Sequence, residues 1–477
     1  MYKVKDKTKE NSKIIIFLIL ILSISIAIIS VFFTKVFPDS LKFIISVNVV
    51  FYSLILLNLF GNLRYMVYFD IIILMIISVE TQGVFMGLYY SAPNAKINIS
   101  LFAYSIIFSF IIEIFLNREK LFSLKNKKEN NFMIIIFFFI VAINILVQKK
   151  ISNKLIDSYM VPFMFYLLIK KFISKYGYKK IINIFLGICC ILSLYGIIEL
   201  IVGKNIILHE YYSNNTPWYI LTLGTVKYGL PYRITTFLGH PLVNASYFLV
   251  ALVFACEMYF NERKSRYLIM IILFCINVFS TFSRAAFLIL VIYLVFLRNC
   301  IGKREKNNIL ITMGMLVIIT AIILANDSII SGLLQRFSRE QGSLSVRMDS
   351  FKLLAQISMK DLFLGIGFNN AGNLRMALTG GLSNANFENG FIIQLIEMGV
   401  IAFIFYYGYV ISIIYQYFNN TKRNKKMDLI FLGSFLIFCM HCFTYNSIGD
   451  PNTLNNVFWL LLALISSNKD ETLMVFK

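Results

Sequence analysis

The chain has 477 residues, of which 58% are hydrophobic and only 14% are charged, and its mean hydropathy is +0.75. This composition excludes an ordinary soluble globular protein, which carries fewer apolar and more charged residues. The net charge of +21 would suggest nucleic acid for a soluble chain, but here the basic residues lie between apolar segments. We therefore predict an integral membrane protein with no nucleic-acid partner.

Long apolar segments recur along the whole chain, each close to the roughly 20 residues with which a helix crosses a bilayer. Helices are expected because hydrocarbon offers the backbone no water to hydrogen-bond. The predicted class is all-α, a polytopic membrane protein with about 12 to 14 transmembrane helices and a large extracytoplasmic loop. The predicted spans are 14–33, 42–60, 65–79, 99–116, 132–148, 155–173, 181–202, 240–260, 266–282, 285–300, 308–325, 389–418, 429–447 and 453–467.

The positions of the basic residues predict the orientation of these spans. With the N-terminus inside, most of the 45 Lys and Arg residues fall in cytoplasmic segments, and both termini are then cytoplasmic. The main exception is Lys149, Lys150 and Lys154, which fall in a predicted outside turn. We divide the chain into a cytoplasmic tail (1–13), a first set of membrane helices (14–325), a large extracytoplasmic loop (326–387) and C-terminal membrane helices (388–477).

Several charged or irregular positions interrupt the apolar spans. Glu113 and Glu199 fall inside spans, where they either line a pore or extend toward the interface. Ser280–Arg284 is a polar break between two spans; an Arg at a helix centre costs about 2.5 to 3.5 kcal/mol, so Arg284 should face a cavity or a partner. The span 389–418 is long enough to be tilted or broken near Glu397-Met398-Gly399.

The loop 326–387 is longer than a passive connection needs, which favours a functional role. It contains an amphipathic stretch, Val346 to Ile357, with Arg347, Phe351 and Leu354 on one face. We expect a short helix there, lying on the bilayer surface. Fixed positive charge in this loop indicates an anionic ligand.

Short motifs occur in a fixed order on the predicted outer side. They are Arg233 with Thr236–Pro241, then Phe282–Ala285, Arg347, Gly365–Gly367, and Glu388–Phe391 with Gly399. Over about residues 180 to 420, this order resembles the O-antigen polymerase and O-antigen ligase superfamily. The resemblance implies a GT-C-like, metal-independent, inverting glycosyltransferase without a cofactor, acting at the outer face of the cytoplasmic membrane on polyprenyl-diphosphate-linked sugars.

The resemblance also implies roles for single residues. Arg233, Arg284 and Arg347 would bind the diphosphate, to which a guanidinium offers a fork of donors. The alternatives are an internal ion pair for Arg284 and lipid headgroups for the other two arginines.

Ligases carry a His-Asn pair where this chain has Glu388-Asn389. We expect Glu388 to act as the general base, with Asn389 orienting it or the acceptor. The alternative for Glu388 is a residue that stabilises a helix N-terminus. His240 is a candidate for substrate contact or a polar residue at a helix mouth.

The predicted function is polymerisation of lipid-linked repeat units into a surface polysaccharide such as O-antigen or capsule. A ligase that moves the glycan to another acceptor and a flippase for the lipid-linked oligosaccharide are the alternatives. Predicted partners are the polyprenyl-diphosphate-linked oligosaccharide and membrane lipid, with a chain-length regulator and a flippase as further candidates.

Overall fold

The computed structural model describes part of the chain, and the regular secondary structure of this part is helical. The described residues are 38–61, 63–76, 100–115, 128–148, 153–209, 232–300, 350–380, 387, 389–418, 433–440 and 453–467. Within these ranges there is no β-strand, so the predicted all-α class is confirmed for them. The predicted spans 14–33 and 308–325, the tail 1–13, Arg347 and Glu388 lie outside the described residues.

The helices follow the predicted spans within a few residues at most ends. In the first half they are α2 (Pro38–Gly61), α3 (Leu63–Ile76), α5 (Leu101–Phe115), α6 (Lys128–Gln148), α7 (Asn153–Leu155), the π-helix η1 (Ile156–Met160), α8 (Val161–Tyr176) and α9 (Tyr178–Val202). In the second half they are α13 (Pro241–Glu262), α14 (Ser265–Ser280), α15 (Arg284–Cys300), α19 (Met359–Leu364), α20 (Ala371–Leu378), α21 (Gly390–Phe418) and α23 (Thr453–Ser467).

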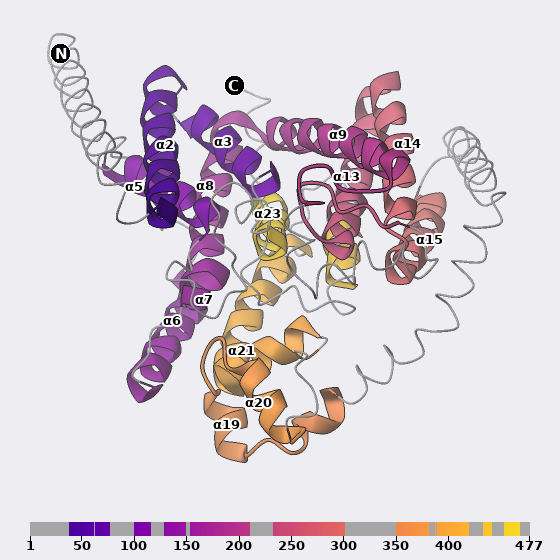
Figure 1. Ribbon diagram of the computed structural model, residues 1–477. Helices are drawn as coiled ribbons and strands as arrows, with labels where there is room; N and C mark the ends of the chain where they lie inside the picture. The colour runs from indigo at the N-terminus through magenta and orange to yellow at the C-terminus, as the bar shows by residue number, and fades with distance from the viewer. Residues whose placement is uncertain are drawn as a thin grey trace, which may run out of the picture.

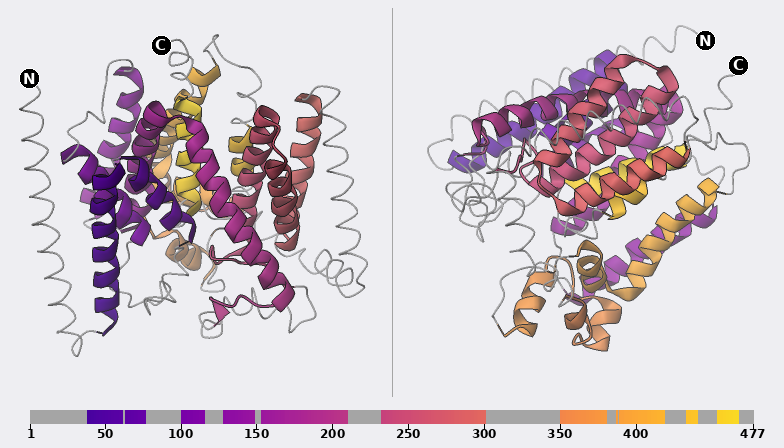
Figure 2. Two further views of the ribbon diagram at one scale, coloured as in Figure 1. Left: turned by 90° about the horizontal axis from the view of Figure 1, so that it is seen from above. Right: turned by 90° about the vertical axis from the view of Figure 1, so that its right-hand side faces the viewer.

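The helices are arranged in two groups (Figure 1). The larger group contains α2, α3, α5, α8, α9, α13, α14 and α15, with α23 packed against α8. In the smaller group α21 runs along α6, and α19 and α20 pack at its lower end (Figure 2). The two groups meet where α21 contacts α23.

A buried aromatic cluster fills this meeting point. Trp459 of α23 is completely buried, and its Nε1 donates to the hydroxyl of Tyr406 on α21 at 3.1 Å. The rings of Phe163 and Tyr166 on α8 lie against the same indole. The cluster thus joins three helices from distant parts of the chain.

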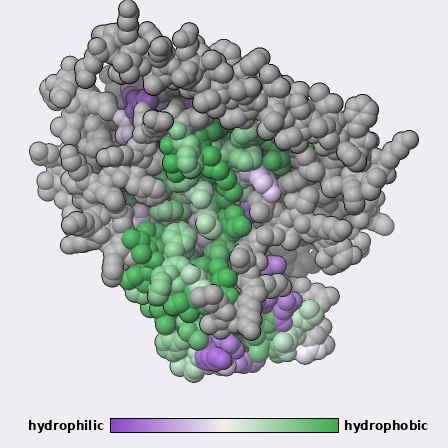
Figure 3. Space-filling model, turned by 90° about the vertical axis from the view of Figure 1, so that its left-hand side faces the viewer, coloured by the Kyte–Doolittle hydropathy of each residue, from purple (hydrophilic) through white to green (hydrophobic). Residues whose placement is uncertain are grey.

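Three of the described helices are long and apolar enough to cross a membrane: Tyr178–Val202, Pro241–Phe260 and Gly390–Tyr417. On α9, exposed apolar residues recur every three or four positions, at Ile191, Leu194, Ile198 and Ile201, the last 79% exposed. Such a stripe suits contact with lipid rather than water. Figure 3 shows hydrophobic residues spread over the described part of another face, with hydrophilic residues toward its lower end.

The amphipathic stretch of the large loop is helical over its described residues 350–354, as expected for a short helix. Leu353 and Ile357 are buried in a small apolar cluster, whereas Phe351 is 53% exposed. Phe351 and Leu354 belong to the face that was predicted for a helix on the bilayer surface, and this placement stays a prediction. The buried side of the turn packs against residues such as Ile393 of α21.

Candidate functional site

The chain between α9 and α13 enters the bundle as irregular backbone. We call residues 232–240, together with the turn 280–284, the junction. His240 precedes α13, and its Nδ1 accepts a hydrogen bond from the Leu242 N–H at 3.1 Å, with Pro241 in the first turn. The predicted helix start at His240-Pro241 is therefore confirmed. The structure gives the imidazole a capping role, and its predicted substrate contact stays a prediction.

Glu199 of α9 holds the first part of the junction. It is completely buried, and its Oε1 accepts from the N–H and the hydroxyl of Thr235, both at 2.8 Å. Its Oε2 accepts from the Thr236 N–H at 2.8 Å, and the Tyr232 hydroxyl donates to Oε1. Four donors replace the water that a carboxylate loses on burial. Both interpretations of Glu199 from the sequence, pore lining and extension to the interface, are thus wrong.

Burial and the neighbouring Glu199 carboxylate raise the pKa of Tyr232. The phenol therefore stays protonated at neutral pH and remains a donor to Glu199. This bond lies one residue before Arg233, and the bonds to Thr235 lie two residues after it. Residues on both sides of Arg233 are thus bonded to a single carboxylate, through the Tyr232 side chain on one side and the Thr235 main chain on the other.

Two asparagines hold the remainder of this segment. The Asn205 Nδ2 donates to the Thr235 hydroxyl at 2.7 Å and to the Thr236 carbonyl at 2.8 Å. The Thr236 hydroxyl donates to Asn244 Oδ1 at 2.6 Å, and Asn244 Nδ2 donates to the Ile234 carbonyl at 3.3 Å. These contacts hold Thr236 at a φ of 45°, a left-handed conformation that is uncommon for a β-branched residue.

Arg233 joins the two parts of the junction. Its Nε donates to the Thr281 carbonyl at 2.8 Å, and the Ile234 N–H donates to the Ser280 carbonyl at 3.3 Å. Phe282, in the same turn, has a φ of 48°. The predicted polar break between two helices is confirmed, and the structure brings this motif against the Arg233 motif. Two sequence motifs more than forty residues apart thus form one polar site.

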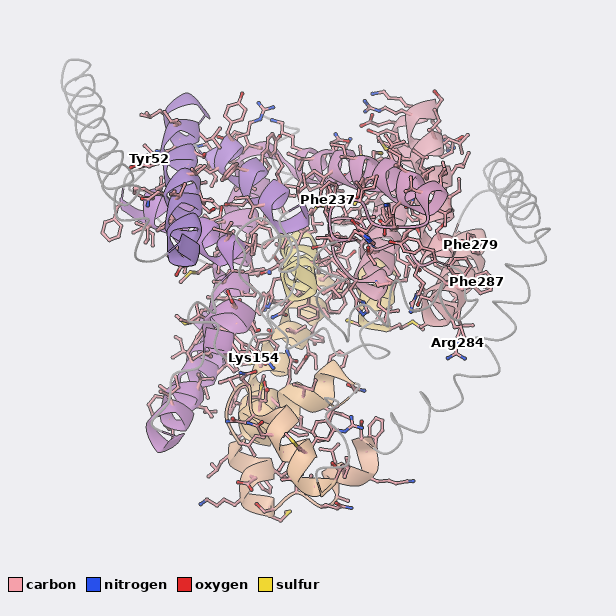
Figure 4. All side chains as sticks on the ribbon, in the orientation of Figure 1. Tyr52, Lys154, Phe237, Phe279, Arg284 and Phe287 are labelled. Carbon is pink, nitrogen blue, oxygen red and sulfur yellow. The ribbon has the colours of Figure 1, made fainter. Side chains whose placement is uncertain are left out.

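Arg284 begins α15 directly after the turn. The rings of Phe279 and Phe287 pack across the turn with centroids 5.4 Å apart. In Figure 4 the Arg284 side chain extends away from the neighbouring helices. The contact that joins the motifs runs from the Arg233 side chain to main-chain atoms of the turn, so the two motifs meet through the Thr281 carbonyl.

The predicted catalytic pair is described only in part, because Glu388 lies outside the described residues, as Arg347 does. Asn389 is buried, and its Oδ1 accepts from the N–H groups of Phe391 at 2.9 Å and Ile392 at 3.3 Å. Asn389 therefore caps the N-terminus of α21. The amide oxygen of Asn389 is used for this cap, and the orienting role expected for Asn389 stays a prediction.

A second polar site, which the sequence did not predict, lies where the large loop meets α21. We call Lys154, Gly365–Asn369 and Glu397–Gly399 the clasp. The Lys154 Nζ lies 2.9 Å from Glu397 Oε1, with both side chains almost completely buried. The same Oε1 accepts from the Asn369 N–H at 3.0 Å. The sequence had marked its parts separately, as the break near Glu397-Met398-Gly399, the Gly365–Gly367 motif and the unexpected outside position of Lys154, but it did not indicate that they meet.

The predicted break in the span 389–418 is confirmed at Gly399, which has φ 80° and ψ 160° inside α21. Main-chain bonds fasten the loop to this break: the Ile366 N–H donates to the Ile396 carbonyl and the Gly367 N–H to the Glu397 carbonyl, both at 3.0 Å. A Cβ on Gly399 would lie 2.4 Å from the Phe363 carbonyl oxygen. Glycine is therefore required where the two backbones touch.

Other buried carboxylates have different partners. Glu113 of α5 lies 2.5 Å from the Lys171 Nζ of α8, so this ion pair replaces both sequence interpretations of Glu113. Asp157 of η1 accepts from the Ser100 N–H before α5. Within the described ranges, no group of three or more His, Cys, Asp and Glu side chains has the geometry of a metal site.

No family model, no curated protein and no solved structure matches this chain.

Proposed function

We propose that this chain is a membrane glycosyltransferase that polymerises polyprenyl-diphosphate-linked oligosaccharide units into a surface polysaccharide. The proposal combines the order of the sequence motifs with the geometry of the junction. In the proposed reaction, a hydroxyl of one lipid-linked glycan attacks the anomeric carbon of another. The bond to the diphosphate oxygen breaks with inversion, and polyprenyl diphosphate leaves with the electron pair.

The observation that carries the proposal is the fixed position of Arg233. Its Nε is held by the Thr281 carbonyl, and residues on either side of it, Tyr232 and Thr235, are bonded to the buried Glu199. A guanidinium fixed through Nε has a defined plane, which is what bidentate binding of phosphate oxygens needs. Strained backbone at Thr236 and Phe282 is typical of sites where function constrains the chain.

Positive charge at this position would stabilise the diphosphate as it leaves. Donors that are already oriented before the reaction stabilise developing negative charge most effectively. In the proposal, Arg284 and Arg347 bind the remaining phosphate oxygens, and Glu388 accepts the proton of the attacking hydroxyl. Asn389 contributes by fixing the start of α21, next to Glu388 in the chain.

The test uses purified full-length protein in lipid nanodiscs with a synthetic polyprenyl-diphosphate-linked repeat unit and a chelator of divalent cations. Polymer formation by the wild type is expected. Arg233→Ala should lower kcat/KM at least about a hundredfold, because charge-assisted hydrogen bonds contribute about 1.5 to 3 kcal/mol each. Glu388→Gln should abolish polymerisation while leaving binding of the lipid-linked donor unchanged.

Arg266→Ala is the matched control, because Arg266 is an exposed arginine beside Glu262 and belongs to neither site. Its activity should equal that of the wild type. Full activity of both Arg233→Ala and Glu388→Gln would refute the proposed roles. Transfer of the glycan to a different added acceptor, without polymer, would identify a ligase instead.

A second candidate, export of the lipid-linked oligosaccharide, is favoured by the break of α21 beside the buried Lys154–Glu397 pair. Transporters place binding sites in discontinuous helices, and buried charges inside a membrane often mark a transport pathway. The test is movement of a fluorescent lipid-linked sugar across proteoliposomes. Export that requires Lys154 but not Arg233 would support this candidate over polymerisation.

A further inference from the structure

The large loop and the first segment of α21 share an apolar core of their own. The N–H groups of Ile366 and Gly367 also donate to main-chain carbonyls of this segment. The buried apolar residues of α21 from Met398 onward belong instead to the main core, together with residues of α8 and α23. We call the described residues between 350 and 397 the cap, which includes α19 and α20 (Figure 1). The buried members of its core are Leu353, Ile357, Ala371, Phe387, Ile392, Ile393 and Ile396.

The chain leaves the cap at Gly399, where α21 folds back on itself. The Tyr407 hydroxyl, after the break, donates to the side-chain oxygen of Gln394, before it. The centroid of the Tyr407 ring also lies 5.6 Å from that of Phe391. In a continuous helix, residues 391 and 407 would be about 24 Å apart along the axis. The two segments of α21 are therefore separate elements joined at one glycine.

Side-chain contacts hold the cap against the bundle. The Lys154 Nζ of α7 lies 2.9 Å from Glu397 Oε1, at the end of the first segment of α21 (Figure 4). The ring of Phe368 in the cap lies 5.1 Å from the ring of Tyr159 in η1. These contacts differ in kind from the shared core and the main-chain hydrogen bonds that hold the cap together.

We infer that the cap is a lid that turns about Gly399, and that the Lys154–Glu397 ion pair is the latch that holds it closed. A body with its own core moves as a unit without exposing that core. Hinges are residues that absorb a change of φ and ψ, and glycine does so with the least strain. A buried ion pair suits a latch, because the attraction between its members is opposed by their hydration once they separate.

The use of such a movement rests on the proposed function. Asn389 caps the first segment of α21, and Glu388 precedes it in the chain. Turning the cap would move this end of α21 relative to Arg233 in the junction. An open cap would admit the lipid-linked donor, and a closed cap would bring the proposed base to the site and exclude water.

The test measures distances in full-length protein in nanodiscs without substrate. Spin labels are attached to p-acetylphenylalanine, a chemistry to which the native cysteines do not react, in place of Lys360 in the cap and Lys204 beside the junction, both exposed. Pulsed electron paramagnetic resonance of the wild type should show one main distance. Lys154→Met deprives Glu397 of its cation in the closed state, and opening lets the carboxylate reach water. The ratio of an open to the closed distance should rise at least about a hundredfold.

Two further variants separate movement from loss of folding. Lys154→Met combined with Glu397→Met should restore the wild-type distance, because no buried charge is left to hydrate. Tyr407→Phe removes one hydroxyl bond to the cap and should raise the open ratio only about fivefold. The exposed Lys264→Met is the matched control and should leave the distance unchanged.

A label pair inside the cap, at Lys360 and Met376, should keep its distance in every variant. A wild-type distance in both Lys154→Met and Tyr407→Phe would overturn the inference. A change inside the cap as large as the change between cap and bundle would overturn it too, because the cap would then have unfolded. These distances need no substrate, so a cap that turns in a protein that forms no polymer would refute the proposed function and leave the lid. A fixed cap in an active polymerase would do the opposite.

Discussion

The junction and the clasp both fasten irregular backbone to long apolar helices through one buried glutamate, but they stabilise its charge in different ways. Glu199 in the junction accepts four hydrogen bonds from neutral groups, two of them main-chain N–H groups. Glu397 in the clasp pairs with Lys154 and accepts from one main-chain N–H. The same residue type therefore supports two loops by two mechanisms.

The two arrangements predict different losses of stability when a partner of the glutamate is removed by mutation. The donors to Glu199 lie within about forty residues of it in the chain, and each contributes an independent hydrogen bond. Glu397 depends on one cation that is 243 residues away in the sequence. The clasp should therefore fail when one partner is removed, whereas the junction should weaken gradually.

The largest effect is expected from Lys154→Met. This substitution leaves Glu397 buried without its cation, so the free energy of unfolding should fall by about 3 to 5 kcal/mol. The measurement is chemical unfolding of the purified protein in detergent micelles, followed by Trp459 fluorescence. An exposed lysine, Lys264, provides the control variant Lys264→Met.

The double variant Lys154→Met with Glu397→Met tests the charge itself. Replacing both members of a buried ion pair by apolar residues is often neutral or stabilising. We expect the double variant to recover most of the lost stability. If the double variant is as unstable as Lys154→Met, the ion pair does not explain the effect.

Gly399→Ala should have the next largest effect, about 3 kcal/mol, because a side chain at φ 80° is strained and its Cβ would meet the Phe363 carbonyl. Gly187→Ala in α9 is the matched control. A Cβ there meets no atom within 4 Å, and Ala favours the helix by about 0.5 to 1 kcal/mol. The same unfolding assay should therefore give opposite signs, and equal signs would contradict the role assigned to the clasp.

Glu199→Gln should destabilise the junction by about 1.5 to 3 kcal/mol, since one of the carboxylate oxygens becomes an amide nitrogen that cannot accept a hydrogen bond. Hydrogen exchange followed by mass spectrometry should show faster exchange of peptides covering 232–240. Peptides from the clasp should be unaffected. Unchanged exchange in the junction would show that Glu199 does not hold it.

The smallest effect is expected from Glu262→Gln. Hydrogen bonding from Lys264 lowers the pKa of Glu262, and both Lys264 and Arg266 lie at its exposed carboxylate. The contribution to stability is present above the unfolded-state pKa and is lost as the pH falls through the lowered pKa. We expect less than about 1 kcal/mol, with no such pH dependence in the variant. A loss of stability as large as that of Glu199→Gln would contradict the expectation that an exposed carboxylate contributes less than a buried one.

The order of residues along the chain was sufficient to predict most helices and the places where they are interrupted. Apolar segments of sufficient length predicted most helix positions within a few residues, and Pro241 and Gly399 marked a helix start and a break. The apolar spans and the helix start at Pro241 depend on hydrogen bonds and steric limits within a few residues of one another, so local sequence is enough to predict them. The conformation of Gly399 also depends on its contact with the Phe363 carbonyl, a distant part of the chain.

The role of each buried polar residue became visible only in the packed arrangement of the helices. Glu113, Glu199 and Glu397 occupy similar apolar surroundings in the sequence, yet Glu113 pairs with a lysine of α8, Glu199 holds a loop, and Glu397 pairs with Lys154. The partners lie tens to hundreds of residues away, so helix periodicity contains no information about them. Because the stability of a buried charge depends on the groups within a few ångströms, its role follows from the packing of the helices.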